Sequence, residues 1–298
     1  MKKTESGHET RVTFYGDYVV KEPIATQPKE MVRWLGKQQV AAKASEALNK
    51  IKNPAYNVPK VLEIDVDKFK VIEAIALGKT LQKISISKLG EPQKLKIIKS
   101  IAEMCNDMNQ EKHIEYEITS YKLDEVYYTI TFDSIIENSK PFISDKAFYN
   151  AIAANEYLLQ SPNYKTALAY GNPDLNPGNI LFDKDSETVS FIDFAESAHS
   201  DVHLTLFSPM VYILECQDII ESIYKGLPKK NKNIILNNNF DHELNMISRR
   251  LLAFYVNGVL FLKNTDEESK QRNLTLMEHH SKKLSQIRLS KHHINWQQ

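Results

Sequence analysis

The sequence has few cysteines and no excess of charge of either sign. Its 298 residues include two cysteines, Cys105 and Cys216, and 38 Lys plus Arg residues against 38 Asp plus Glu residues. Both cysteines lie in segments with the apolar spacing of amphipathic helices, which favours reduced, packed thiols and a cytoplasmic protein. Balanced charge gives no bulk attraction to a phosphate backbone, so we do not expect a nucleic-acid partner.

The sequence also lacks an apolar run long enough to cross a bilayer. The longest run, Leu251 to Leu262, contains Asn257 and Gly258 and is shorter than the about 20 residues that a membrane helix needs. No apolar stretch follows the lysines near the N-terminus, so residues 1–10 do not have the pattern of a signal peptide. With 42% hydrophobic residues, the chain has the composition of a globular protein with a substantial core.

The N-terminal part alternates short β-prone runs with one helical segment. Two of the β-prone runs flank Gly16-Asp17, which predicts a hairpin with a two-residue turn. Apolar residues at helical spacing follow, and two further β-prone runs come after them. The predicted elements are strands at 11–15 and 18–21, one long helix or two short ones at 28–51 with a possible break near Gly36, and strands at 58–64 and 69–75. This order predicts a small α+β domain over residues 1–76.

Beyond residue 76 the pattern is mainly helical. Periodic apolar residues predict helices at 92–109, 145–159, 204–224 and 242–263. The exception is a pair of short β-prone runs, at 180–182 and 189–192, that flank an acidic turn and predict a hairpin. We therefore expect a second, helix-rich domain over residues 77–298.

One segment combines turn-forming residues with carboxylates. Asp174-Leu175-Asn176-Pro177-Gly178-Asn179 leads into the predicted hairpin, and Asp193 closes it. Because a hairpin returns the chain beside its starting point, Asn179 and Asp193 should lie at the same end of the ribbon. An amide oxygen and a carboxylate are hard ligands of the kind that Mg²⁺ accepts. Asp174 would then orient an attacking hydroxyl and accept its proton, which is the chemistry of phosphoryl transfer.

A surface turn is the competing interpretation of this segment. Asn, Pro and Gly are the usual turn formers, so residues 174–179 alone fit an ordinary loop about equally well. The apolar strands on either side, at the spacing of one hairpin, favour a functional site. An aspartate at the end of an apolar strand is costly to bury without a partner, and a bound metal would explain it.

The run from Asp174 to Asp183, followed by Phe191-Ile192-Asp193-Phe194, resembles the catalytic loop and metal-binding segment of aminoglycoside phosphotransferases, choline kinases and related small-molecule kinases. The resemblance implies a two-lobed, protein-kinase-like α+β fold with a β-rich small lobe and a helical large lobe. It implies that Asp174 is the catalytic aspartate and that Asn179 and Asp193 bind metal. Mg²⁺ and ATP or GTP are the implied cofactors, with a small-molecule hydroxyl as acceptor.

The resemblance extends into the N-terminal part and implies a nucleotide site there. Lys21 matches the lysine that contacts the α- and β-phosphates, and an ammonium is a suitable point charge for them. Glu46 on the following helix is the expected partner of Lys21, and Glu30 is the alternative. Main-chain groups near Glu73 and Ile75 are expected to bind the adenine.

The sequence departs from the family pattern in two places. Asn172-Pro173 stands before Asp174 where the family has His-Gly, so either Asn172 replaces the histidine or Tyr170-Gly171 corresponds to His-Gly with two residues inserted. Gly16 is the one glycine of the expected phosphate-covering loop, and the first strand should be short or missing. These departures leave two alternatives open: a pseudokinase that binds a nucleotide or a protein without turnover, and a kinase with a protein acceptor. The sequence predicts neither the acceptor nor the oligomeric state.

Overall fold

The computed structural model describes residues 3–6, 9–84, 89–110, 168–172 and 174–201, together with Lys225, Gly226 and Lys229. These residues include the predicted N-terminal strands and helix, the helix near residue 100 and the catalytic hairpin. The helices predicted at 145–159, 204–224 and 242–263, and Cys216, lie outside the described residues.

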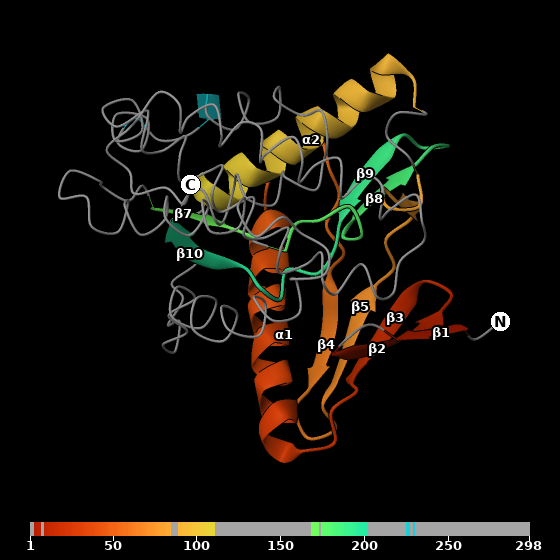
Figure 1. Cartoon of the computed structure of the whole chain (residues 1–298), viewed down its shortest axis with the longest axis vertical. Coiled ribbons are helices and arrows are strands. Elements are labelled where there is room, and N and C mark those ends of the chain that lie inside the picture. Colours follow the sequence, from red (N-terminus) through yellow and green to blue (C-terminus); the bar gives the residue numbers. More distant parts are fainter. Residues whose placement is uncertain are drawn as a thin grey trace, which may run out of the picture. The chain divides into compact units, whose positions relative to one another are not determined.

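A five-stranded antiparallel sheet, in the order β1-β2-β3-β5-β4, forms the N-terminal region (Figure 1). The strands are β1 (Lys3–Ser6), β2 (Thr10–Tyr15), β3 (Tyr18–Pro23), β4 (Val61–Asp65) and β5 (Lys70–Ala74). The predicted turn joins β2 to β3: Tyr15 pairs with Tyr18, and Gly16 has a φ of 74°. Glycine adopts this φ without strain. Strand β1, which the sequence leaves short or missing, is present and spans 4 residues.

Helix α1 (Pro28–Leu48) runs without a break through Gly36 and packs against β4 and α2. Pro28 occupies the first turn, where its missing N–H costs no hydrogen bond. The buried face includes Trp34, whose indole N–H donates to Thr10 Oγ1 over 2.8 Å. The apolar periodicity of the sequence therefore predicted the helix correctly, and this hydrogen bond joins it to β2.

The catalytic hairpin belongs to a small second sheet in the order β6-β8-β9. Its strands are β6 (Lys79–Thr80), β8 (Ile180–Asp183) and β9 (Thr188–Phe191), and helix α2 (Glu91–Gln110) packs against β9 (Figure 1). Strands β7 (Leu168–Gly171) and β10 (Ala198–Asp201) pair with each other. The hairpin and the helix near residue 100 form where the sequence predicts them.

Two segments of the N-terminal region, at Asn57 and at Gly78, contact the two outer edges of this hairpin. On the β9 side, Asn57 N donates to Val189 O over 2.8 Å, and Asn57 O accepts from Phe191 N over 2.9 Å. On the β8 side, the chain leaving β5 passes through Gly78, which has a φ of 103°. A Cβ atom there would lie 2.5 Å from the carbonyl carbon of Phe182, so only glycine allows this close approach.

The five-stranded sheet, α1, α2 and the sheet β6-β8-β9 belong to one compact unit, which comprises residues 1–116, 170–199 and 215–227. A second unit comprises residues 117–169, 200–214 and 228–298. The division of the chain at residue 76 into two lobes stays a prediction.

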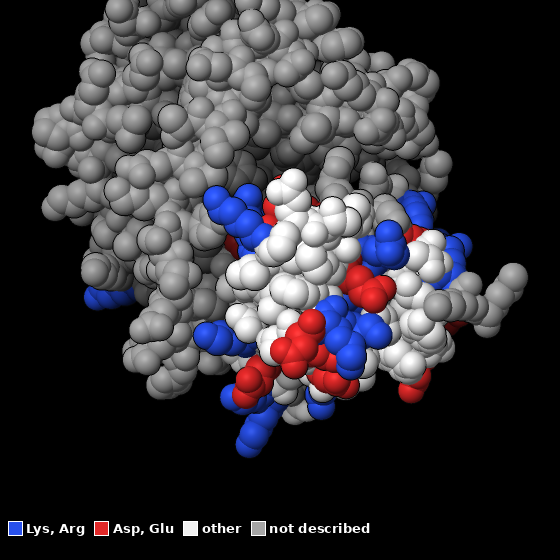
Figure 2. Space-filling model, turned by 90° about the horizontal axis from the view of Figure 1, so that it is seen from below, with Lys and Arg blue, Asp and Glu red and all other residues white. Residues whose placement is uncertain are grey.

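The environments of Cys105 and of the charged side chains agree with what the composition predicts. Cys105 is buried, and burial raises the pKa of its thiol to about 12, as expected for a packed, protonated cysteine. Figure 2 shows Lys and Arg side chains interspersed with Asp and Glu on one face of the described part of the chain. None of the described helices combines the length and apolarity that a membrane crossing requires.

Candidate active site

Asn179 and Asp193 leave the same end of the catalytic hairpin, as the sequence predicts. Ile192 N donates to Asn179 O over 3.0 Å, so the two chain segments lie side by side there. Asp193 has a φ of 59°, in the left-handed region that few residues other than glycine adopt. Such strain is typical of functional sites, where the surrounding structure holds a residue in a costly conformation.

The side chain of Asn172 connects Asp193 to the loop that carries Asp174. Its Nδ2 donates to Asp193 O over 2.9 Å, and its Oδ1 accepts from Asp174 N over 3.0 Å. The residue is only 2% exposed, so water cannot readily replace either bond. Of the two alternatives left open by the sequence, this geometry favours Asn172 as the residue that replaces the family's histidine.

Replacing Asn172 with alanine should destabilise the protein by about 1–3 kcal/mol, because two part-buried hydrogen bonds to main-chain groups are lost. Chemical denaturation would measure the change. Asn172→Asp should fall between the parent and the alanine variant, since a carboxylate still accepts from Asp174 N but no longer donates to Asp193 O. Asn176→Ala, in the same loop but at a more exposed position, is the control. Equal stability of Asn172→Ala and the parent would contradict the bridging role.

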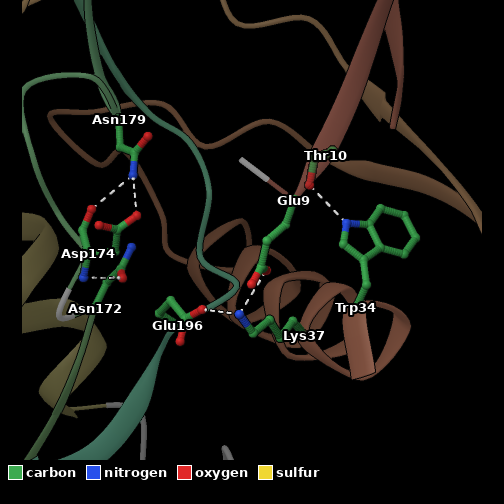
Figure 3. Close-up of polar contacts among 8 residues, drawn as sticks. All are labelled: Glu9, Thr10, Trp34, Lys37, Asn172, Asp174, Asn179 and Glu196. Atoms are coloured by element: carbon green, nitrogen blue, oxygen red, sulfur yellow. Dashed lines mark hydrogen bonds and ion pairs between the residues drawn. The ribbon is translucent and has the colours of Figure 1, made fainter. Parts of the chain in front are cut away.

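The Asp174 carboxylate accepts hydrogen bonds from two amides of its own loop. Asn176 Nδ2 donates to Oδ1 over 3.1 Å. Asn179 Nδ2 donates to Oδ2 over 3.0 Å (Figure 3). Although one side of Asp174 is open to solvent, the pKa of its carboxyl is raised to about 6. Desolvation by the surrounding protein is the main cause, followed by repulsion from Asp193, and the two amide hydrogen bonds oppose the shift. A carboxyl group with such a pKa is well suited to take up a proton near neutral pH.

The residues at this end of the hairpin fit a divalent cation. Because both hydrogen bonds of the Asn179 side chain are made by Nδ2, to Asp174 O and to Asp174 Oδ2, the amide oxygen remains available as a ligand. Asp193 would supply a negative oxygen beside it. The described residues contain no group of three or more His, Cys, Asp or Glu side chains with metal-binding geometry. An amide and a carboxylate fit Mg²⁺, which takes few protein ligands and fills its other positions with water and phosphate oxygens.

Lys21 forms a buried ion pair with the side chain of Glu73. Lys21 Nζ lies 2.6 Å from Glu73 Oε2, and the two side chains are 12% and 9% exposed. The pairing of β3 with β5 puts both on one face of the sheet, since Lys21 lies opposite Val71 and Val19 lies opposite Glu73. Burial lowers the pKa of Lys21, but the charges of Glu73 and Asp193 outweigh this effect and the net pKa is raised. Lys21 is therefore a cation whose charge interacts with that of Asp193 at the end of the hairpin.

The expected pair between Lys21 and Glu46 does not form, which corrects the sequence prediction. Glu46 lies on the solvent side of α1, with 69% of its side chain exposed, and pairs with Lys50 over 2.9 Å. Glu30, the alternative partner, is exposed in the first turn of α1. The helical period turns both acids away from the sheet, so the partner of Lys21 comes from the neighbouring strand instead.

Gly16 lies in the turn where the sequence predicts it, while some of the main-chain groups expected to bind adenine are already bonded within the protein. Gly16 lies in the turn between β2 and β3, next to Asp17, whose carbonyl accepts from Ile75 N over 2.9 Å. This places the turn that contains Gly16 beside the end of β5, and the role of Gly16 in covering phosphates stays a prediction. Ile75 N is thus already bonded, and Glu73 is paired on both sides, with Val19 of β3 and with Val61 of β4. The first main-chain groups outside the sheet come later, at Ala76 and Leu77.

The roles of two side chains were missed from the sequence. Glu73 was assigned only main-chain contacts, although its alternation with Val71 in a short apolar strand puts an acid on a buried face. An acid on a buried face needs a cation, and Lys21 lies on the strand beside it. Asn172 was considered only as a residue that replaces the histidine of the family pattern. Its spacing of two residues from Asp174 is typical of an asparagine whose side chain bonds to the main chain of its own loop.

No family model matches the chain, and no curated protein matches it in sequence. Solved structures match it in fold. The GDP complex of aminoglycoside 2'-phosphotransferase-IIIa has a TM-score of 0.64 and 16% identity, over 95% of this chain and 93% of that chain. A choline/ethanolamine kinase family protein from Mesorhizobium loti has a TM-score of 0.56 and 13% identity, over 97% and 92%. The gentamicin complex of APH(2")-IIa has a TM-score of 0.54 and 14% identity, over 93% and 90%. The chain therefore has the α+β, protein-kinase-like fold of aminoglycoside phosphotransferases and choline kinases, as its sequence predicts.

Proposed function

We propose that this protein transfers the γ-phosphoryl group of Mg²⁺-bound ATP or GTP to a hydroxyl group of a small molecule. The observation that carries the proposal is the cluster at the end of the hairpin. There, one buried asparagine links the main chains of Asp174 and Asp193, and Asn179 bonds directly to Asp174. The fold supports the proposal, because the similar structures include a GDP complex of a phosphotransferase and a choline/ethanolamine kinase family protein.

Each residue of the cluster has a distinct task in this proposal. Asp174 orients the acceptor hydroxyl and takes up its proton at a carboxylate oxygen as the new bond to phosphorus forms. Asn179 Oδ1 and the Asp193 carboxylate would hold Mg²⁺, which neutralises charge on the phosphates when bound. Lys21 supplies a positive point charge for the phosphates nearer the nucleoside.

The nucleotide base would bind where the chain leaves β5. Because Ile75 N donates to Asp17 O, the hydrogen bonds to the base would come from the Ile75 carbonyl and from the main chain of Ala76 and Leu77. This position is one to two residues later than the sequence suggests. Gly78 then returns the chain to β8, which would keep the base close to the hairpin.

Phosphorus NMR of the protein with Mg²⁺, ATP or GTP, and a panel of hydroxyl compounds tests the proposal. The panel would contain aminoglycosides, amino alcohols, sugars and hydroxyl-bearing peptides. A new phosphate ester that requires Mg²⁺ and the acceptor, and that is absent with Asp174→Asn, would support phosphotransfer. Mg²⁺-dependent nucleotide binding without an ester or hydrolysis would instead support a nucleotide-binding module. No nucleotide binding at all would contradict both functions.

Replacing Lys21 with methionine should both weaken nucleotide binding and destabilise the protein. Loss of the cation leaves Glu73 buried without a partner, which typically costs about 3–5 kcal/mol. Adding Glu73→Gln to Lys21→Met should restore most of the stability, because the unpaired charge is gone, but not the nucleotide affinity. Calorimetric titration with Mg·ADP and thermal unfolding would measure the two effects. Recovery of affinity in the double variant would show that Lys21 acts only through Glu73.

A further inference from the structure

Lys37 of α1 connects the helix to the segment that follows Asp193. Its Nζ lies 2.6 Å from Glu196 Oε1 and 2.8 Å from Glu9 Oε2 (Figure 3). Glu196 stands in a tight turn, since Ser197 N donates to Phe194 O over 3.0 Å and Phe194 is buried. Glu9 immediately precedes β2. One ammonium thus binds two carboxylates from parts of the chain that are far apart in sequence.

The Lys37 side chain is largely buried at this contact, whereas its partners Glu9 and Glu196 are 56% and 39% exposed. Lys37 follows Trp34 by three residues, so both lie on the face of α1 that is turned toward the protein. Only 19% of the Lys37 side chain is exposed. Burial lowers the pKa of Lys37, but the hydrogen bonds with Glu196 and Glu9 outweigh it and the net pKa is raised. The ammonium therefore stays charged between its two partners.

The connection compensates for a contact that α1 does not make. Lys21 is held by Glu73 within the sheet, and the acidic residues Glu30 and Glu46 of α1 are exposed to solvent. No ion pair among the described residues therefore joins α1 to Lys21. The ion pair that α1 does make near the cluster is to Glu196, three residues beyond Asp193.

We propose that Lys37 is a positioning residue, which fixes the turn after Asp193 against α1 by binding Glu196 and Glu9 together. This turn begins at Phe194, directly after Asp193, so holding the turn would also hold the main chain that carries the Asp193 carboxylate. The inference rests on the proposed function, because the metal assigned to Asp193 would be that of a Mg²⁺-nucleotide complex. Lys37 would not touch the nucleotide or the metal.

The test compares the parent with Lys37→Met, Lys37→Arg and Lys43→Met. Lys43 lies on the exposed side of the same helix, so its variant is a matched control. Two quantities are measured by calorimetry: the affinity for ADP in EDTA, and the Mg²⁺ concentration that gives half of the Mg²⁺-dependent gain in ADP affinity. Removing a residue that orients a metal ligand typically costs about 10-fold or more in metal affinity. For Lys37→Met we expect this Mg²⁺ concentration to rise by about 10-fold or more, while the affinity for ADP in EDTA stays unchanged. For Lys43→Met we expect neither quantity to change.

Two further variants and one ligand-free measurement complete the design. Lys37→Arg should restore the parent value, because a guanidinium also binds two carboxylates. Glu196→Gln should give the same increase as Lys37→Met, and the double variant should show no further increase, as expected for two residues of one contact. In the ligand-free protein, hydrogen exchange of the amides at 194–197 should be faster in Lys37→Met than in Lys43→Met.

The outcomes separate this inference from the proposed function. If ADP affinity falls equally with and without Mg²⁺, or if the Mg²⁺ requirement is unchanged, the positioning role is overturned. If the parent shows no Mg²⁺-dependent binding, the proposed function fails. In that case, faster exchange at 194–197 in Lys37→Met would still support the anchoring of the turn, and unchanged exchange would overturn it.

Discussion

Replacing Asp193 with asparagine should abolish Mg²⁺-dependent phosphoryl transfer while leaving the protein folded. The variant removes the one negatively charged oxygen that the proposed metal site contains. Charge stabilisation by a bound metal is worth several kcal/mol, so the rate should fall by at least about 10³-fold. Asparagine, like aspartate, tolerates the φ of 59° at this position. The main-chain carbonyl would still accept from Asn172 Nδ2, as it does in the parent.

Initial rates at saturating Mg²⁺ and nucleotide would measure the loss, and thermal unfolding would confirm that the variant is folded. Asp183→Asn provides a matched control, because Asp183 lies at the opposite end of the same hairpin and bonds to Ser186 in the turn. This control should keep the parent rate. Transfer by Asp193→Asn at the parent rate would rule out the proposed metal site.

Replacing Asp174 with asparagine should lower turnover by about 10²–10⁴-fold, the usual contribution of a positioned base. The affinity for Mg·ADP should stay close to that of the parent, because Asp174 faces the acceptor and not the nucleotide. Steady-state kinetics would show the effect in kcat with little change in KM for the nucleotide. Asp185→Asn, in the exposed turn of the hairpin, is the matched control. An unchanged kcat would show that Asp174 is not the base.

The pH dependence of turnover gives a second check on Asp174. Only the deprotonated carboxylate can accept a proton, and the pKa of this group is raised to about 6. The rate should therefore fall as the pH drops below about 6 and should level off above it. Because repulsion from Asp193 contributes to the raised pKa, Asp193→Asn should lower the pKa of Asp174, which carbon NMR of the carboxyl group would detect. No shift in that variant would mean that the two carboxylates do not interact.

The parts of the site that were predictable from the sequence are those set by local chain geometry. Asn179 and Asp193 flank two short apolar strands, and a hairpin of that spacing must bring its two ends together. Helix α1 and the turn at Gly16 follow in the same way from apolar period and from the φ that the turn requires. Because the helix, the turn and the hairpin depend on residues that are close in the chain, they could be predicted from the sequence.

The parts that were wrong or missed depend on contacts between distant segments. Which acid meets Lys21 is decided by the register of β3 against β5 and by the rotation of α1, and neither is visible in the sequence. The role of Asn172 depends on the carbonyl of Asp193, 21 residues away. A lysine at the position of Lys37, on the same helical face as Trp34, was a signal that could have been used, since lysine is costly to bury without a partner.

The hydrogen bonds on both edges of the catalytic hairpin also protect it against pairing errors. Because side chains alternate along a strand, a slip of one residue between β8 and β9 would turn every side chain of the slipped strand to the opposite surface. On β8, Leu181 would offer little resistance by itself, since its neighbours Ile180 and Phe182 are apolar too. Asn57 on one outer edge and Leu81 on the other allow only one alignment of the ribbon. Hydrogen bonds from outside the hairpin thus help to fix the alignment of its two strands. The alignment in turn sets the spacing of the proposed ligands Asn179 and Asp193.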